Sequence, residues 1–76
     1  MRLYAGGHLT FYMPGRKHML ELTLYEPIPM REILARAGIP LPEVALTILN
    51  GEQVELDTVL VKDGDVVRVF SSVDGG

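Results

Sequence analysis

The residues with the clearest chemical potential stand at the end of the sequence, Gly75 and Gly76. A C-terminal carboxylate is a poor electrophile because its negative charge is delocalised, so it reacts with nucleophiles only after activation. Neither glycine has a side chain, and a narrow channel in a partner enzyme can therefore close on bare backbone here. Average glycine usage would place two glycines together at one end in about one chain in 200. The pattern favours a C-terminus that is presented to an enzyme.

Other residue types in the chain offer weaker chemistry. The sequence contains no cysteine, which excludes disulfides and a thiol nucleophile. The two histidines, His8 and His18, do not stand at a metal-ligand spacing from another ligand, and we expect no metal site. The sequence Asp63-Gly64-Asp65 is too short for a calcium loop, and a reverse turn explains it.

Length and charge limit the class of protein. The chain has 76 residues, which is enough for one domain with one modest core. Its formal net charge is −3, and its basic residues are scattered except for Arg16-Lys17-His18, so we expect no nucleic-acid partner. We expect no membrane association either, because no apolar run reaches the roughly 18 residues that span a bilayer. Without cysteines or a signal-peptide layout at its start, the chain is expected to be cytoplasmic.

The first part of the chain predicts two strands. Residues 2–5 form the first, and residues 6–13 fit either a continuing strand or one helical turn. A Pro-Gly turn at residues 14–17 leads into a second strand at residues 18–24. There Leu20, Leu22 and Leu24 alternate with Met19, Glu21 and Thr23, as in a half-buried strand.

A helix follows the second strand. Pro29 suits its first position, where the missing N–H costs nothing. Four apolar residues fall on one stripe that should face a sheet: Met30, Ile33, Leu34 and Ala37. Glu32 and Arg36 form an i,i+4 pair on the opposite side. Gly38 is expected to end the helix as a left-handed cap.

The remaining segments predict a mixed sheet. They are a strand at residues 45–49, an Asn-Gly hairpin turn at 50–51, a short strand at 52–55, an irregular turn at 56–61, a second turn at 62–65 and a last strand at 66–70. If the first and last strands pair in parallel, the helix packs across four to five strands, which is an α+β, β-grasp fold. We expect this domain to cover residues 1–70 and a flexible tail to cover residues 71–76.

Three segments carry a more specific pattern. They are the helix with its stop at residues 30–39, the Asn-Gly hairpin with the Leu-Asp-Thr and Val-Lys-Asp-Gly-Asp sequences after it, and the ending Val69-Phe70-Ser71-Ser72-Val73-Asp74-Gly75-Gly76. Through these segments the chain resembles the MoaD/ThiS family of small ubiquitin-like sulfur carriers over essentially its whole length.

Within that family, the ending resembles the Phe-Pro-Pro-Val-x-Gly-Gly sequence common in molybdopterin synthase small subunits. Phe70, Val73, Gly75 and Gly76 match it, and Ser71-Ser72 replace the two prolines. The turn at residues 14–17 is also more similar to the MoaD branch than to the shorter ThiS hairpin.

The resemblance implies a carrier rather than an enzyme, with no cofactor bound to the chain itself. An E1-like adenylating enzyme of the MoeB/ThiF type would use ATP and magnesium to activate the carboxylate of Gly76. A persulfide or sulfide source would then convert that group to a thiocarboxylate. The acceptor would be a synthase such as the molybdopterin synthase large subunit, in molybdenum or tungsten cofactor synthesis. Thiamin, sulfur-amino-acid and tRNA thiolation pathways are the alternatives.

Docking on such partners also needs a surface beside the tail. Alternation along the last strand directs Val67 and Val69 to the core, and Arg68 and Phe70 outward. Phe70 is either an interface anchor or a residue that packs over the sheet edge, and Val73 is the expected contact within the tail.

A second hypothesis belongs to another class of protein. In it the chain is a ubiquitin-like interaction module whose tail is inert, or a modifier that is joined to lysines through Gly76. Removal of Gly76 distinguishes these hypotheses, because sulfur transfer needs that residue and binding by an inert module does not.

Overall fold

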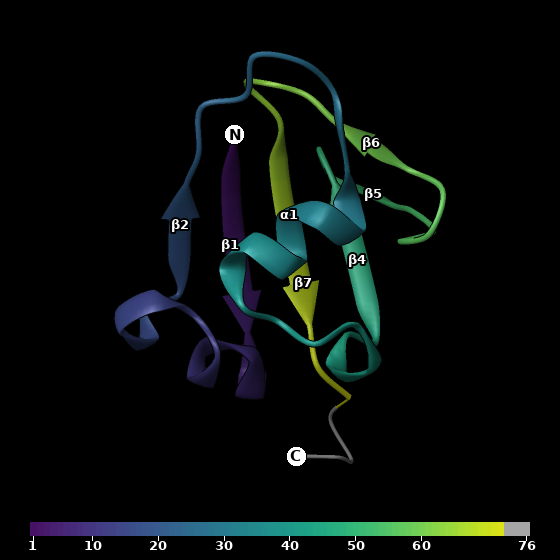
Figure 1. Ribbon diagram of the computed structural model, residues 1–76. Helices are drawn as coiled ribbons and strands as arrows, with labels where there is room; N and C mark the ends of the chain where they lie inside the picture. Colours follow the sequence, from purple (N-terminus) through teal and green to yellow (C-terminus); the bar gives the residue numbers. More distant parts are fainter. Residues whose placement is uncertain (73–76) are drawn as a thin grey trace.

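A computed structural model describes residues 1–72 of the chain (Figure 1). Its elements are β1 (Arg2–Gly6), η1 (Gly7–Phe11), η2 (Pro14–Arg16), β2 (Met19–Glu21), β3 (Ile28–Pro29), α1 (Met30–Ala37), η3 (Leu41–Glu43), β4 (Leu46–Leu49), β5 (Glu52–Gln53), β6 (Leu60–Val61) and β7 (Val66–Phe70). Five strands form one sheet in the order β2-β1-β7-β4-β5, and β3 pairs with β6 in a second, two-stranded sheet. Helix α1 crosses one face of the larger sheet (Figure 1). The predicted α+β, β-grasp architecture is confirmed.

The first and last strands are neighbours at the centre of the sheet. Strands β1 and β7 run parallel, with Leu3 opposite Val67 and Ala5 opposite Val69. Strands β2 and β4 flank this pair and are antiparallel to it. The sheet is therefore mixed, as predicted, and its central pairing joins the two ends of the domain.

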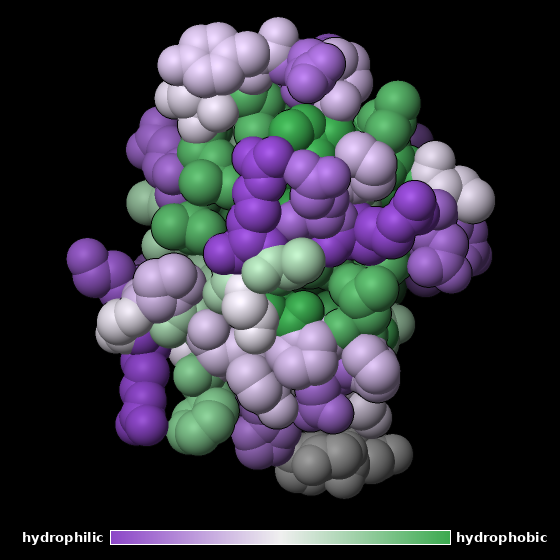
Figure 2. Space-filling view, in the orientation of Figure 1, coloured by the Kyte–Doolittle hydropathy of each residue, from purple (hydrophilic) through white to green (hydrophobic). Residues whose placement is uncertain are grey.

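The core lies between the inner face of this sheet and α1. The sheet contributes Leu3, Val67 and Val69, which are fully buried. The predicted stripe of the helix, Met30, Ile33, Leu34 and Ala37, is also buried. In the space-filling view from the helix side, hydrophilic side chains lie across α1, as an amphipathic helix requires (Figure 2).

Residues 7–17, here called the lobe, follow β1 and contain the two short 3₁₀ turns η1 and η2. Leu9 and Met13 are buried in the core, whereas Phe11 points outward and is 63% exposed. Of the two alternatives for residues 6–13, the helical turn is therefore correct. The two buried side chains fix the lobe to the sheet and leave its tip in solvent.

The ends of α1 follow the predicted pattern with one difference. Gly38 takes a left-handed conformation, with φ of 85°, and Arg36 pairs with Glu32 at 2.6 Å. Pro29, however, lies before the helix rather than in it, because its ψ of 140° is extended. It belongs to β3, where it pairs with Leu60 of β6. The prediction that residues 56–61 form an irregular turn missed this short pairing.

The predicted strand at residues 18–24 is wrong in length. Strand β2 covers three residues, Met19–Glu21, because its partner β1 begins at Arg2. The amide of Leu22 still donates to the carbonyl oxygen of Met1 at 2.9 Å, and beyond that point no residue of β1 remains. Leu24 is nevertheless buried, and its amide donates to Asp63 Oδ1 at 3.0 Å.

The turn before β7 is organised around Asp65, a buried carboxylate. Asp65 accepts hydrogen bonds from the Lys62 amide at 2.9 Å and from Asn50 Nδ2 at 3.0 Å. The Oδ1 atom of Asn50 accepts one from the Val66 amide at 2.9 Å. Burial raises the pKa of Asp65, but these donors and the nearby Lys62 ammonium outweigh burial and lower the pKa below its ordinary value. The Asn50-Gly51 turn, with φ of 50° and 87°, is thereby joined to the start of β7.

Across residues 1–72, no helix is long and apolar enough to cross a membrane.

The substitution Leu34→Ala tests the helix–sheet packing. Leu34 is fully buried, so its truncation should leave a cavity and lower the free energy of unfolding by about 2–5 kcal/mol. Urea denaturation of the variant and of Ala35→Gly, an exposed change on the same helix, measures this cost. A loss at Leu34 no larger than the roughly 1 kcal/mol expected of the glycine would contradict the packing described here.

The substitution Asp65→Asn tests the buried carboxylate. At neutral pH it should lower the free energy of unfolding by about 1–3 kcal/mol, because two donors lose their charged acceptor. The pKa of Asp65 is lower in the folded than in the unfolded chain. Its contribution is therefore complete above the unfolded value and declines as pH falls through the folded value.

The difference between wild type and Asp65→Asn should consequently shrink as the pH is lowered below about 4. Asp57→Asn, at an exposed position, is the matched control. A difference that stays constant between neutral and acidic pH would show that the Asp65 charge contributes nothing.

Candidate partner-binding site

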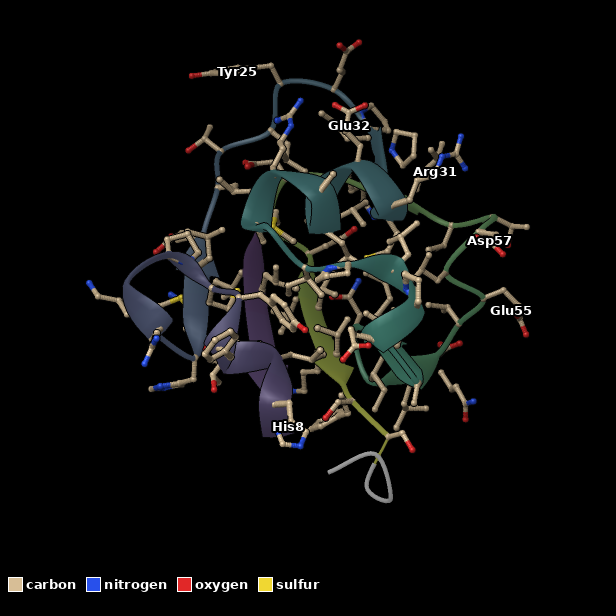
Figure 3. All side chains as sticks on the ribbon, turned by 60° about the horizontal axis from the view of Figure 1, so that its bottom comes forward. His8, Tyr25, Arg31, Glu32, Glu55 and Asp57 are labelled. Carbon is tan, nitrogen blue, oxygen red and sulfur yellow. The ribbon has the colours of Figure 1, made fainter. Side chains whose placement is uncertain are left out.

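The parallel pairing of β1 and β7 brings two separate segments to one edge of the sheet. Gly7 and His8 follow β1, and Ser71 and Ser72 follow β7, so both pairs leave the sheet at the same edge. Strand β4 is antiparallel to β7 and therefore begins there. Figure 3 turns this edge toward the viewer and shows His8 beside the end of β7.

An apolar groove lies at this edge, on the face of the sheet opposite α1. It has a volume of about 920 Å³ and is lined by Gly7, His8, Ala45, Leu46, Ile48, Phe70, Ser71 and Ser72. Leu46 lies opposite Phe70 in the β4–β7 register, and Ile48 lies one step further along β4 on the same face. Three large apolar side chains thus line a surface that the domain itself does not cover.

The Phe70 ring packs directly on the backbone of Gly6, which has no side chain to occupy that space. The two residues are partners in the β1–β7 register. A Cβ atom built on Gly6 would lie 2.5 Å from Phe70 Cδ1, so the ring rests on the glycine backbone. Phe70 is 37% exposed in this position. The ring therefore packs on the sheet and still presents an apolar edge to the groove.

Ser71, the first residue after β7, is tied to the lobe. The His8 amide donates to Ser71 Oγ at 3.2 Å across 63 residues of sequence. Gly7 has a φ of 63°, and a Cβ atom there would lie 2.6 Å from Ser71 Oγ. A side chain at Gly7 would collide with this contact, and the left-handed backbone also favours glycine. The chain therefore leaves β7 in a direction set by the lobe.

The comparison with protein families agrees with this architecture. A family model described as Mut7-C ubiquitin matches residues 2–74. The chain belongs to the Mut7-C ubiquitin family. No curated protein and no solved structure matches the chain. Membership of this family makes the domain ubiquitin-like, in agreement with the β-grasp fold.

The sequence-predicted site residues of this Mut7-C ubiquitin domain fall in three places. Phe70 lines the groove. Arg68 points to the same face, but it stacks on Tyr4 instead, with its guanidinium carbon 4.6 Å from the ring centroid. Val73, Gly75 and Gly76 lie outside the described residues. Their predicted roles, and those of Phe70 and Arg68, stay predictions.

Sequence reasoning missed the β4 side of the groove. In β4 the polar residue, Thr47, is buried and the apolar residues Leu46 and Ile48 point outward. The usual rule that polar residues face solvent would give the opposite orientation. The signal that could have shown this orientation is the register between β4 and β7, because Leu46 must share a face with Phe70 once these two strands pair.

The close contact between Gly6 and Phe70 yields a double-mutant test. Gly6→Ala should lower the free energy of unfolding by about 1–3 kcal/mol, because its methyl group forces the Phe70 ring out of place. In a Phe70→Ala background the same change should cost less. The coupling should amount to about 0.5–3 kcal/mol, measured by urea denaturation of the four proteins. Equal costs in the two backgrounds would mean that Phe70 does not rest on Gly6.

Proposed function

We propose that this Mut7-C ubiquitin domain is a cytoplasmic sulfur carrier of the MoaD/ThiS type. Its carboxylate at Gly76 is activated by an E1-like adenylating enzyme and becomes a thiocarboxylate. The observation that supports the proposal best is the position of the groove. The segment that leads to Gly75-Gly76 leaves β7 beside an uncovered apolar surface, so one partner can hold the domain and receive its end.

The proposed chemistry has two steps, and both are redox-neutral. The carboxylate of Gly76 attacks the α-phosphate of ATP on the partner, and pyrophosphate leaves. Hydrosulfide then attacks the carbonyl carbon of the acyl-adenylate, and AMP leaves with the bonding electron pair. The product carries one sulfur in place of one oxygen. The domain contributes the reacting group and its presentation, and the partner contributes ATP, magnesium and the catalytic residues.

Reach and shape support this division of labour. Six residues, Ser71 to Gly76, can extend roughly 20 Å at about 3.3 Å per residue. The two glycines remove the side chains from the part that would enter the deepest section of a channel. The proposal requires that the carboxylate of Gly76 be free. The acceptor that we favour is a molybdopterin synthase large subunit, on the resemblance of the last residues to the MoaD ending.

A second candidate is a ubiquitin-like interaction module that works through the groove and not through its C-terminus. The specific observation in its favour is the outward direction of Leu46 and Ile48 beside the exposed edge of Phe70. Exposed apolar patches on small domains are characteristic of binding sites. This candidate needs the same surface as the carrier but no reaction at Gly76.

Intact-mass spectrometry separates the two candidates. The domain is incubated with ATP, magnesium, sulfide and candidate E1-like adenylating enzymes. A carrier gains the mass that corresponds to the exchange of one oxygen for sulfur, and the gain maps to the C-terminal peptide. A variant that lacks Gly76 should show no gain, with its melting temperature nearly unchanged.

Groove variants complete this experiment. Phe70→Ala should slow formation of the thiocarboxylate by about tenfold, the kinetic equivalent of about 1.4 kcal/mol of lost docking. Leu60→Ala removes an exposed apolar side chain from β6 and should leave the rate unchanged. Absence of a mass gain with every enzyme, together with a groove-dependent complex, would replace the carrier with the interaction module.

A further inference from the structure

The charges of this protein are distributed unevenly along the chain. Residues 1–20 contain three of the seven basic residues and none of the ten acidic ones, since the first acidic residue is Glu21. Two of those three, Arg16 and Lys17, lie in the lobe together with His8. The remainder of the chain is strongly acidic. A protein with a net charge of −3 therefore carries a local positive region.

The positive charges of the lobe are not used to stabilise the domain by ion pairs. Within residues 1–72 the ion pairs are Met1–Asp63, Arg36–Glu32 and Lys62–Asp65. None of them involves Arg16 or Lys17. Glu43 and Glu21 border the lobe, because each lines a hollow with lobe residues, but neither forms an ion pair with it.

Arg16 is held in a conformation that is uncommon for its residue type. Its φ is 55°, and the other non-glycine residue in the described chain with positive φ is Asn50, which the hairpin turn explains. A left-handed conformation is unfavourable for such a residue because its Cβ atom crowds the following carbonyl oxygen. The guanidinium carbon of Arg16 lies 4.8 Å from the centroid of the Phe11 ring. The backbone thus places a cation on an aromatic ring that is itself largely exposed.

The lobe is continuous with the apolar groove through His8. His8 and Gly7 line the groove and also line a neighbouring hollow that Phe11 and Tyr12 share. The guanidinium of Arg16 in turn lies over the Phe11 ring. Starting at Ile48 and Leu46, the surface therefore runs from an apolar section across His8 to an aromatic and basic section. Figure 1 shows the lobe at the same end of the sheet as the end of β7.

From this arrangement we propose that the groove and the lobe form one docking surface, and that its partner is a protein segment with an apolar anchor flanked by acidic residues. The anchor fills the groove between Phe70, Leu46 and Ile48. The carboxylates lie over the lobe and pair with Arg16 and Lys17. This inference concerns the surface alone and holds whether or not Gly76 carries sulfur.

Charge and shape favour a protein segment over a nucleic acid. Single-stranded nucleic acids bind to basic grooves in which several aromatic rings stack on successive bases. Here Phe11 is the highly exposed aromatic of the lobe, and acidic side chains at Glu43 and Glu21 limit the basic region on two sides. An apolar groove without a cation at its centre suits an aliphatic or aromatic side chain rather than a phosphate.

Chemical-shift mapping on the ¹⁵N-labelled full chain tests the proposal. The probe is a peptide of about ten residues with one leucine flanked by glutamates, and the counter-probes are the same peptide with lysines for glutamates and a single-stranded oligonucleotide of equal length. The glutamate peptide should shift amides of both sections, including His8, Phe11 and Ile48. Its affinity should fall with added salt, because exposed charges are screened.

Two double variants of equal charge locate the contact. Arg16→Glu with Lys17→Glu should weaken binding of the glutamate peptide by about tenfold. Arg31→Glu with Arg36→Glu makes the same charge change on α1 and should weaken it less than about twofold. Circular dichroism and melting temperature establish that both variants fold.

Three outcomes would overturn the proposal. The first is an absence of shifts with the glutamate peptide, and the second is an equal loss of affinity in the two double variants. The third is tighter binding of the oligonucleotide at the lobe, which would make the surface a nucleic-acid site. Because no step of this experiment involves ATP or sulfur, failure of the sulfur-carrier proposal would leave its result unaffected.

Discussion

The parallel pairing of β1 with β7 is the interaction on which the rest of this structure depends. It places the first and last strands of the domain side by side and buries Leu3, Val67 and Val69 between the sheet and α1. Because parallel strands end at the same edge, it also brings the lobe and the residues after β7 together. The groove, the contact between His8 and Ser71, and the position of the aromatic tip of the lobe all follow from this one pairing.

Gly6 and Gly7 allow the residues at the end of β7 to pack closely against the end of β1. The Phe70 ring occupies the space where a side chain at Gly6 would stand, and Ser71 Oγ occupies the corresponding space at Gly7. A small domain has few residues to spare for a binding surface, and here the same close contacts that complete the fold also shape the groove. One side of the Phe70 ring packs on Gly6, and the other side remains exposed to the groove.

Much of the architecture could be predicted from local patterns. The apolar stripe of α1, the cap at Gly38 and the Asn50-Gly51 turn are local features, and each was correctly predicted because neighbouring residues determine them. The length of β2 and the pairing of β3 with β6 were not predicted, since they depend on where a distant strand begins. Pro29 was displaced from the helix for the same reason, because Leu60 pairs with it.

The candidate site was predicted in part. The direction of Phe70 follows from alternation along one strand, which is a local property. The directions of Leu46 and Ile48 contradict the usual polarity of a strand, and the buried Thr47 shows that the pairing partner decided the orientation. Arg16 was visible in the sequence as part of a basic cluster. Its contact with Phe11 depends on the left-handed backbone conformation of Arg16, which no local motif predicts.

The central position of β7 also has a consequence for the order of events during synthesis. The last strand of the domain is a middle strand of its sheet, so the sheet cannot be completed until residue 70 has left the ribosome. Until then β1 and β4 both lack their common neighbour, and the edge that carries the groove does not exist. Any chain that displays this edge has already folded. A partner that recognises the groove would therefore bind only domains in which β7 has paired with β1, and chains that stop before residue 66 would lack its binding site.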